Sequence, residues 1–370
     1  MARTKNIRFD IYRAQLSIDD KGHNKYNHAI QKVKEFDTLL PDGWTSSKRA
    51  SFKLWSKHKE EIEEEMKQSG TQWLLDEIIN AAINGLLPNT AMQYDEEIIE
   101  IDRDSYINRP DKPNIISFQI TRLRTDSLPA KKKIGRPRTD IELDDDEYIG
   151  EFTVVMYDAS LGIVAIQSNR YGVGPSVICR YLNYLRKQYY EIIGERPPKY
   201  LAGQLKPVID DSLIQRALEA DCIKKVRVRC SNESVDALIS EDNTYLGGIA
   251  RSINQQAGVV FDVTMSVKTK VDKQSLPKDA IKDVARRFIS MISDPKVSKE
   301  IKKDAKVEMT IVSKEDASAE AVDFLIPKVN FYVHLTVEDR VPVRSEYFHD
   351  RTMESYEGYM PRLAMLLRGE

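Results

Sequence analysis

Apolar residues recur with two different periods along this chain, and each period predicts a different secondary structure. Over residues 74–86, leucine, isoleucine and alanine return every three or four positions, which predicts an amphipathic helix. Gly85 and Pro88 mark its end, because glycine is favoured just past a helix and proline soon afterwards. Strands are predicted at 7–16, 98–107 and 115–123.

The clearest hairpin lies in the middle of the chain. Two apolar runs, 151–158 and 162–167, are joined by a short turn that includes Gly162. A glycine-containing turn then leads to Pro175, which suits the first turn of a helix, and apolar residues continue at helical spacing to Ile192.

Gly194 and the Pro197-Pro198 pair predict a domain boundary, because glycine ends the helix and paired prolines force an extended connection. We therefore expect an N-terminal α+β domain over 1–195, with a mobile basic and acidic loop near 125–148, and a C-terminal α+β sheet domain over 196–370. In the second domain, apolar and polar residues alternate strictly at 226–230, 259–267, 307–311 and 331–337. Helices are predicted at 281–292 and 345–367. The fold class is thus α+β: a helical and β-hairpin domain followed by a mixed or antiparallel sheet covered by helices.

Composition limits where a partner can bind. The 370 residues carry 56 Lys+Arg and 58 Asp+Glu, so any affinity for nucleic acid must come from local patches rather than from net charge. The three cysteines have no metal-ligand or disulfide spacing, and we expect no cofactor and no metal. No run of about 18 apolar residues occurs, so the expected location is cytoplasmic, without membrane insertion.

One basic segment resembles an AT-hook, a short element that lies in the DNA minor groove. It reads Lys131-Lys132-Lys133-Ile134-Gly135-Arg136-Pro137-Arg138. Glycine lets the backbone approach the groove floor, proline keeps the neighbouring chain extended, and arginine side chains favour the narrow, negative groove of A·T tracts. The alternative is a solvated basic loop tip between two strands. The residues with candidate contacts to nucleic acid here are Lys131, Lys132, Lys133, Arg136 and Arg138.

A second candidate patch lies on the polar face of the C-terminal sheet. Lys224 and Lys225 stand at a strand entry, and Arg227, Arg229 and Lys268 point outward from predicted strands. Together they could contact phosphates, although charged residues are also usual on the solvent-exposed face of any sheet. In the helix after Pro175, Tyr184 and Arg186 are the candidates expected at the surface.

Motifs for the common enzyme classes are missing from the sequence. It contains no phosphate-loop, dinucleotide, zincin or serine-hydrolase signature. A metal-dependent nuclease would need a carboxylate at a strand end and an acidic-x-Lys triplet on the next strand; Asp158 suits the first role, but Gln167 and Asn169 stand where the triplet should be. His349 precedes Asp350, but it needs a serine or cysteine placed by the fold to activate a nucleophile.

The segment from Glu151 to Leu182, with its hairpin, its Arg170-Tyr171-Gly172-Val173 turn and its helix start, resembles bacterial families of uncharacterised domains. The stretch 350–362 resembles them too. These families recur in phage-defence loci and include proteins similar to the B component of the Kiwa system, described as a DNA-binding partner of a membrane subunit. The resemblance implies a non-enzymatic component of anti-phage defence that binds DNA or another nucleic acid and has a partner defence subunit. An interaction or scaffold protein in a homo-oligomer is the alternative, and a nuclease with an unrecognised site is a third.

Overall fold

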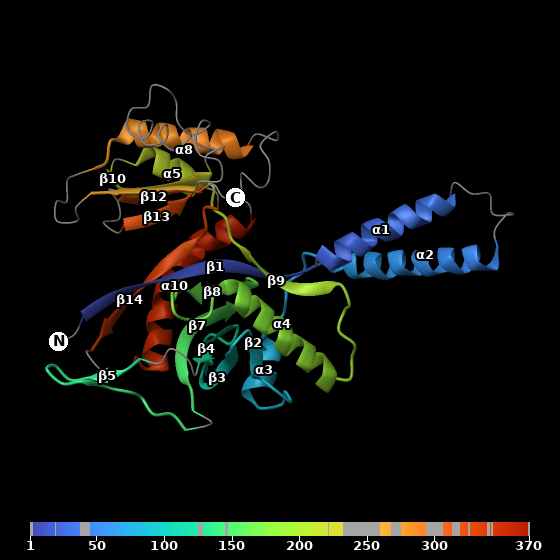
Figure 1. Cartoon of the computed structure of the whole chain (residues 1–370), viewed down its shortest axis with the longest axis horizontal. Coiled ribbons are helices and arrows are strands. Elements are labelled where there is room, and N and C mark those ends of the chain that lie inside the picture. The colour runs from blue at the N-terminus through green and yellow to red at the C-terminus, as the bar shows by residue number, and fades with distance from the viewer. Residues whose placement is uncertain are drawn as a thin grey trace. The chain divides into compact units, whose positions relative to one another are not determined.

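The chain folds into two compact units (Figure 1). The computed structural model describes residues 3–18, 20–37, 45–124, 129–144, 147–220, 222–231, 260–267, 275–293, 306–312, 319–324, 326–338, 341 and 343–368. The first unit comprises Met1–Val208 together with Asn330–Glu370, and the second comprises Ile209–Val329. This division differs from the boundary expected at 195/196, because the C-terminal segment returns to the first unit.

An eight-stranded sheet forms the centre of the first unit, with strand order β14-β1-β8-β7-β4-β3-β2 and β9 as a further partner of β1. The pairings of its strands are antiparallel. Its strands are β1 (Arg3–Ile18), β2 (Met92–Tyr94), β3 (Glu97–Asn108), β4 (Ile115–Arg124), β7 (Ile149–Asp158), β8 (Ile163–Gln167), β9 (Leu201–Pro207) and β14 (Asn330–Val337).

Helices cover both faces of this sheet. Helices α3 (Asp76–Ile83) and α4 (Pro175–Ile192) share one buried cluster with alternate residues of β4, such as Phe118 and Ile120. The intervening residues of β4 face helix α10 (Ser345–Arg368), where Gln119 Nε2 donates to Ser345 Oγ at 3.2 Å. Both faces of β4 are thus buried although its residues alternate. The apolar Ile116, Phe118 and Ile120 belong to the α3–α4 cluster, and the polar Ser117 and Gln119 bond to α10.

The first unit also carries a helical hairpin, α1 (Asp20–Asp37) and α2 (Ser46–Lys67). Aromatic contacts join the two helices, with ring centroids 4.9 Å apart for His28 and Trp55 and 5.8 Å apart for Phe36 and Phe52. Within the described part of the chain, no helix is both long enough and apolar enough to cross a membrane.

The second unit is a four-stranded antiparallel sheet in the order β11-β10-β12-β13. Helices α5 (Ser212–Glu219) and α8 (Lys278–Ser293) contribute to its core, which includes Val226, Val228 and Phe288. Its strands are β10 (Cys222–Ser231), β11 (Val260–Ser266), β12 (Lys306–Val312) and β13 (Ala319–Asp323).

The predicted α+β fold class is confirmed, including strands with antiparallel pairing and helices against each sheet. One assignment was wrong. The run at 331–337 is a strand, but it pairs with β1 in the first unit rather than with the second sheet. Alternation reports that one face of a strand is buried; it does not report which sheet the strand joins.

Candidate nucleic-acid interface

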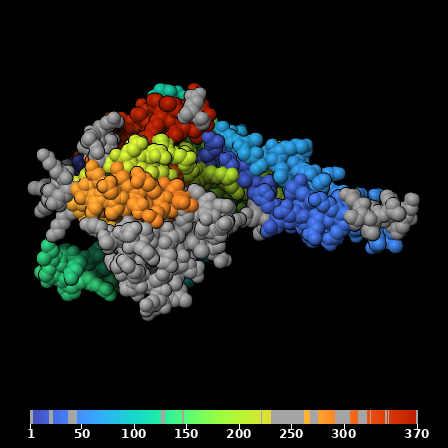
Figure 2. Space-filling model, turned by 90° about the horizontal axis from the view of Figure 1, so that it is seen from above, coloured from blue at the N-terminus to red at the C-terminus, as the bar shows by residue number. Residues whose placement is uncertain are grey.

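The AT-hook-like segment forms a small β-hairpin. Strands β5 (Lys131–Lys132) and β6 (Arg138–Thr139) pair Lys132 with Arg138, and Arg136 N donates to Lys133 O at 3.1 Å to close the turn. Gly135 has φ +75°, a conformation that favours glycine at the third position of such a turn. Residues 129–140 are exposed throughout, and their atoms, in green, lie at the surface in Figure 2.

The five cationic side chains of this hairpin are exposed to water. Arg138 Nε lies 4.0 Å from Asp140 Oδ1, an exposed pair that contributes little. In the described part of the chain, Lys131, Lys132, Lys133 and Arg136 form no ion pair. The structure therefore concentrates these charges on one projecting turn, where an anionic partner would not have to displace strong internal partners.

The hairpin conformation differs from an extended AT-hook. Gly135-Arg136-Pro137 begins within the turn, so an extended Gly-Arg-Pro core requires the Lys133–Arg136 hydrogen bond to open. The strands on either side have two residues each, and this opening breaks few contacts. The observed geometry matches the second interpretation of the sequence, a solvated basic tip between strands β4 and β7.

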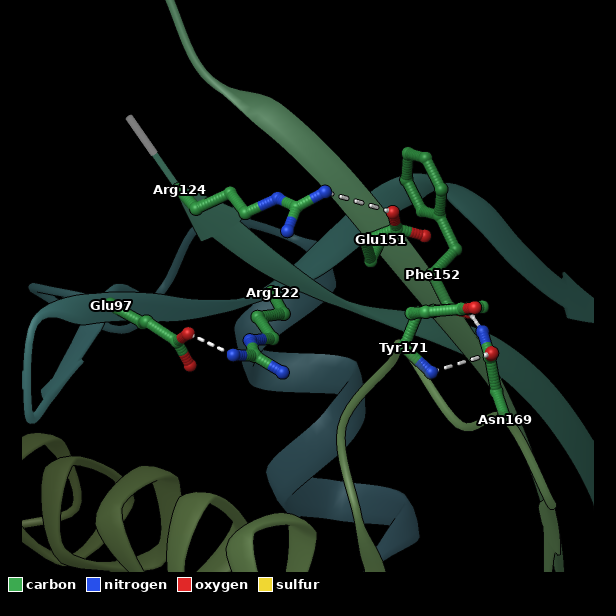
Figure 3. A network of polar contacts seen from close by, with 7 residues as sticks. All are labelled: Glu97, Arg122, Arg124, Glu151, Phe152, Asn169 and Tyr171. Carbon is green, nitrogen blue, oxygen red and sulfur yellow. Dashed lines mark hydrogen bonds and ion pairs between the residues drawn. The ribbon is translucent and has the colours of Figure 1, made fainter. Parts of the chain in front are cut away.

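Two ion pairs lie where β4 ends and β7 begins, at the base of the loop that carries the hairpin (Figure 3). Arg122 Nη2 pairs with Glu97 Oε1, and Arg124 Nη2 lies 3.4 Å from Glu151 Oε1. The alternation of the strand places both arginines on the same face as the α3–α4 core. The sequence analysis missed them, because it read this run only as a strand.

The turn before α4 is pinned to β7. Asn169 Nδ2 donates to Phe152 O at 2.7 Å, and Val173 N donates to Thr153 Oγ1 at 2.8 Å. A Cβ on Gly172 would lie 2.2 Å from the same Thr153 oxygen, so this position requires glycine. Tyr171 remains 64% exposed and offers a ring to solvent.

The basic residues of the second unit stand among carboxylates. Arg227 donates to both oxygens of Asp262, from Nε at 3.0 Å and from Nη2 at 2.6 Å, and this pairing holds the pKa of Asp262 below its usual value. Lys306 on the neighbouring strand pairs with Glu308 at 3.0 Å and Asp323 at 3.4 Å. The candidates Lys224, Lys225, Arg227 and Arg229 all lie on β10, whereas Lys268 is outside the described residues.

Two residues of helix α4 that were expected at the surface are buried or half-buried. Arg186 is 7% exposed, so its predicted exposure was wrong, and Tyr184 is half-buried. Tyr181 on the same helix is fully buried. Its hydroxyl donates to Thr90 O at 2.8 Å and accepts from Ile101 N at 2.8 Å.

The nuclease candidate Asp158 caps a turn. Its Oδ1 atom accepts from Ser160 N at 2.9 Å and Leu161 N at 3.2 Å, and Oδ2 accepts from Tyr356 Oη at 2.7 Å. The side chain is fully buried, and these partners use both oxygens. Among the described residues, no group of three or more His, Cys, Asp or Glu is placed to hold a metal ion.

The fold does place a serine beside His349. Ser117 Oγ lies 2.5 Å from His349 Nδ1, although the two residues are 232 positions apart in the sequence. Ser117 and His349 are 3% and 4% exposed, between β4 and α10. A nucleophile needs access to substrate, so this pair is a hydrogen bond of the core.

One comparison with known proteins gives a match. The model of a family of unknown function, DUF6731, matches residues 46–361, a range that includes elements of both units. No curated protein matches the chain.

Proposed function

Because the chain belongs to DUF6731, a family of unknown function, we propose a function from its geometry: a non-enzymatic protein that binds nucleic acid, foremost DNA, through the basic hairpin. The observation that carries the proposal is the hairpin itself, in which five cations share one exposed turn. Each phosphate neutralised by a cation releases counterions, so this hairpin can supply affinity although the whole chain has a net charge of -2.

The hairpin is a better candidate than the β10 face. On β10, a phosphate would compete with Asp262 for Arg227, whereas no carboxylate holds Arg136 in the described residues. Two modes of binding remain for the hairpin. It can enter a groove as a two-stranded ribbon, or open its turn and lie in the minor groove as an extended hook.

The test removes two charges from the hairpin. We expect Arg136→Ala with Arg138→Ala to weaken binding to A·T-rich duplex DNA and to flatten the salt dependence by about one to two phosphate equivalents. Binding to A·T-rich duplex, G·C-rich duplex, single-stranded DNA and RNA would be titrated over a salt series.

The matched control removes two charges from β10, as Lys225→Ala with Arg229→Ala. Wild-type affinity of the hairpin variant at low salt would exclude the hairpin as the contact. If the β10 variant instead lost affinity for every sequence equally, the phosphate contacts would belong to the second unit. Thermal melting of both variants checks that each remains folded.

The role in anti-phage defence, with a partner subunit, is proposed on the resemblance of the Glu151–Leu182 segment and of the stretch 350–362. A host strain carrying the hairpin variant should plate phage at the efficiency of a strain without the gene. Full protection by that variant would show that defence does not depend on the hairpin.

A specific observation also favours the alternative of an oligomeric scaffold. In the described residues of α1 and α2, only Gly22, Ala29 and Ile62 are buried, while Leu54 is 52% exposed. Helices of 18 and 22 residues usually gain their stability from packing, so a second copy of the chain would complete their burial. If so, Leu54→Glu should lower the mass measured by light scattering toward the 42.5 kDa monomer, whereas Gln68→Glu, at an exposed position, should not.

A further inference from the structure

A cleft of about 370 Å³ lies in the first unit, away from the hairpin residues. One wall is the segment that enters α3, with Trp73 and Leu74, and the other is the C-terminal half of α4, with Arg186, Tyr190 and Ile193. These residues belong neither to the basic hairpin nor to the segments that resemble the defence families.

Two residues that line this cleft each carry a buried hydrogen-bond donor without a partner. Trp73 is 2% exposed and its Nε1 atom has no acceptor; Arg186 is 7% exposed and its Nη2 atom has none either. A buried donor without an acceptor costs about 1–3 kcal/mol, and more when it is charged. Native proteins rarely leave such groups unsatisfied, and here both belong to residues of the same cleft.

The charge of Arg186 is only partly compensated by the protein. Its Nη1 atom donates to Leu201 O at 2.8 Å, and its guanidinium lies 5.2 Å from the centroid of the Tyr190 ring. No ion pair joins it to a carboxylate in the described part of the chain. A buried guanidinium is ordinarily paired with an anion, so the missing partner is an acceptor with negative charge.

The other residues that line the cleft determine which kind of anion it favours. Leu74 and Ile193, which are 58% and 44% exposed, give the cleft apolar surface beside the donors. The same cleft includes Glu77, which accepts from Tyr189 Oη at 2.8 Å, and the exposed Glu195. These carboxylates disfavour a second negative charge on the ligand, and therefore favour a carboxylate over a phosphate monoester.

We infer that this cleft binds a small monocarboxylate with an apolar body, its carboxylate accepting from Arg186 Nη2 and Trp73 Nε1. The apolar body would lie against Leu74 and Ile193. This ligand is independent of the nucleic-acid proposal, because none of these residues belongs to the hairpin. A free amino acid with an apolar side chain also fits, since its ammonium group can meet Glu77 or Glu195.

The test uses the full chain labelled with ¹⁵N and follows the indole N–H signal of Trp73, identified by its loss in Trp73→Phe. The probes are 4-methylpentanoate, 3-phenylpropionate and L-leucine, with 4-methylpentanamide and inorganic phosphate as comparisons. We expect a carboxylate probe to shift the Trp73 signal and to bind at least tenfold more tightly than the amide. The L-leucine arm tells whether an ammonium group adds affinity; binding of either carboxylate form supports the site.

Variants then assign the contact. Arg186→Met should weaken carboxylate binding at least tenfold, whereas Lys187→Met, the same change at the exposed neighbouring position, should leave it unchanged. If Arg186→Met does not fold, Trp73→Phe keeps an aromatic ring and removes the N–H donor, and should weaken binding about threefold or more. Calorimetry measures this variant, because it lacks the indole signal. Equal binding of acid and amide, binding of phosphate alone, or no response of the Trp73 signal to any carboxylate would overturn the inference.

Discussion

His349 shows how burial sets the charge of a single side chain. Burial against β4 lowers its pKa below the usual value; Asp350 and Asp111 oppose this shift, while Arg109 and Lys112 reinforce it. In the unfolded chain His349 has a pKa of about 6.5. As the pH falls, His349 therefore takes up a proton in the unfolded chain before it does so in the folded chain. The contribution of neutral His349 to stability is complete above about pH 6.5, and it is lost as the pH falls through 6.5 toward the folded pKa.

Replacing His349 should make stability less sensitive to acid. We expect His349→Gln to flatten the fall of the melting temperature between pH 7 and pH 5, because glutamine does not titrate. His23→Gln, at an exposed position of α1, is the control and should keep the wild-type slope. An unchanged slope in His349→Gln would mean that other groups dominate the loss of stability in acid.

At the same scale, the sequence identified the charged residues of the candidate site but not their partners. The exposure of Lys131 to Arg138 follows from a polar run between strands, and the structure agrees. The burial of Arg186 does not follow, because its helix position alone cannot reveal its contact with Leu201 of β9. The bidentate contact between Arg227 and Asp262 likewise depends on strand register, which alternation leaves undefined.

At the scale of elements, β9 packs against the core through a glycine. A Cβ on Gly203 would lie 2.3 Å from the ring of Trp73, and the Gly203 backbone is held by Asn183, which accepts from its N–H at 2.8 Å. We expect Gly203→Ala to destabilise the first unit by about 1–3 kcal/mol through overpacking, measured by chemical denaturation.

Gly358 provides the matched comparison. It lies within helix α10, with nothing within 4 Å of an added Cβ, so Gly358→Ala should instead stabilise by about 0.5–1 kcal/mol. Destabilisation by both changes to the same extent would show that close packing on Trp73 is not the cause.

Elements with a clear apolar period were predictable from the sequence, and elements without one were not. The helix ending at Ile192 and the strands at 98–107 and 115–123 agree with α4, β3 and β4. Strand β9, Leu201–Pro207, holds a glycine and a proline and has too few apolar residues for a clear pattern. It becomes a strand because seven of its residues pair with β1, and such long-range pairing leaves no local signal.

At the scale of the molecule, the second unit is an insertion in the first. Pro207, at the end of β9, pairs with Tyr12, and Asn330, at the start of β14, pairs with Asp10. These partners are two residues apart on β1, so the chain leaves and re-enters the first unit across roughly 7 Å. The predicted boundary near residue 195 could not show this, because local sequence can indicate a domain boundary but not that a later segment rejoins an earlier domain.

An insertion of this kind should be removable. We expect the first unit to remain folded when residues 209–329 are replaced by a linker of about three glycine and serine residues, as a single cooperative thermal transition would show. Removal of 330–370 instead should unfold it, because that deletion takes away β14 and α10. Aggregation of the first variant with loss of its secondary structure would show that the first unit depends on the second.

The pairing of β1 with β14 also sets the order in which the protein folds as it leaves the ribosome. Arg3 pairs with Val337, so β1 lacks one neighbour until residue 337 has been translated. At about 5–20 residues per second, that wait is roughly 17–67 s, during which residues 209–329 emerge as one continuous stretch. The inserted unit can thus finish folding while the first unit is still incomplete, and the nascent chain must keep one edge of β1 from premature association until β14 has been translated.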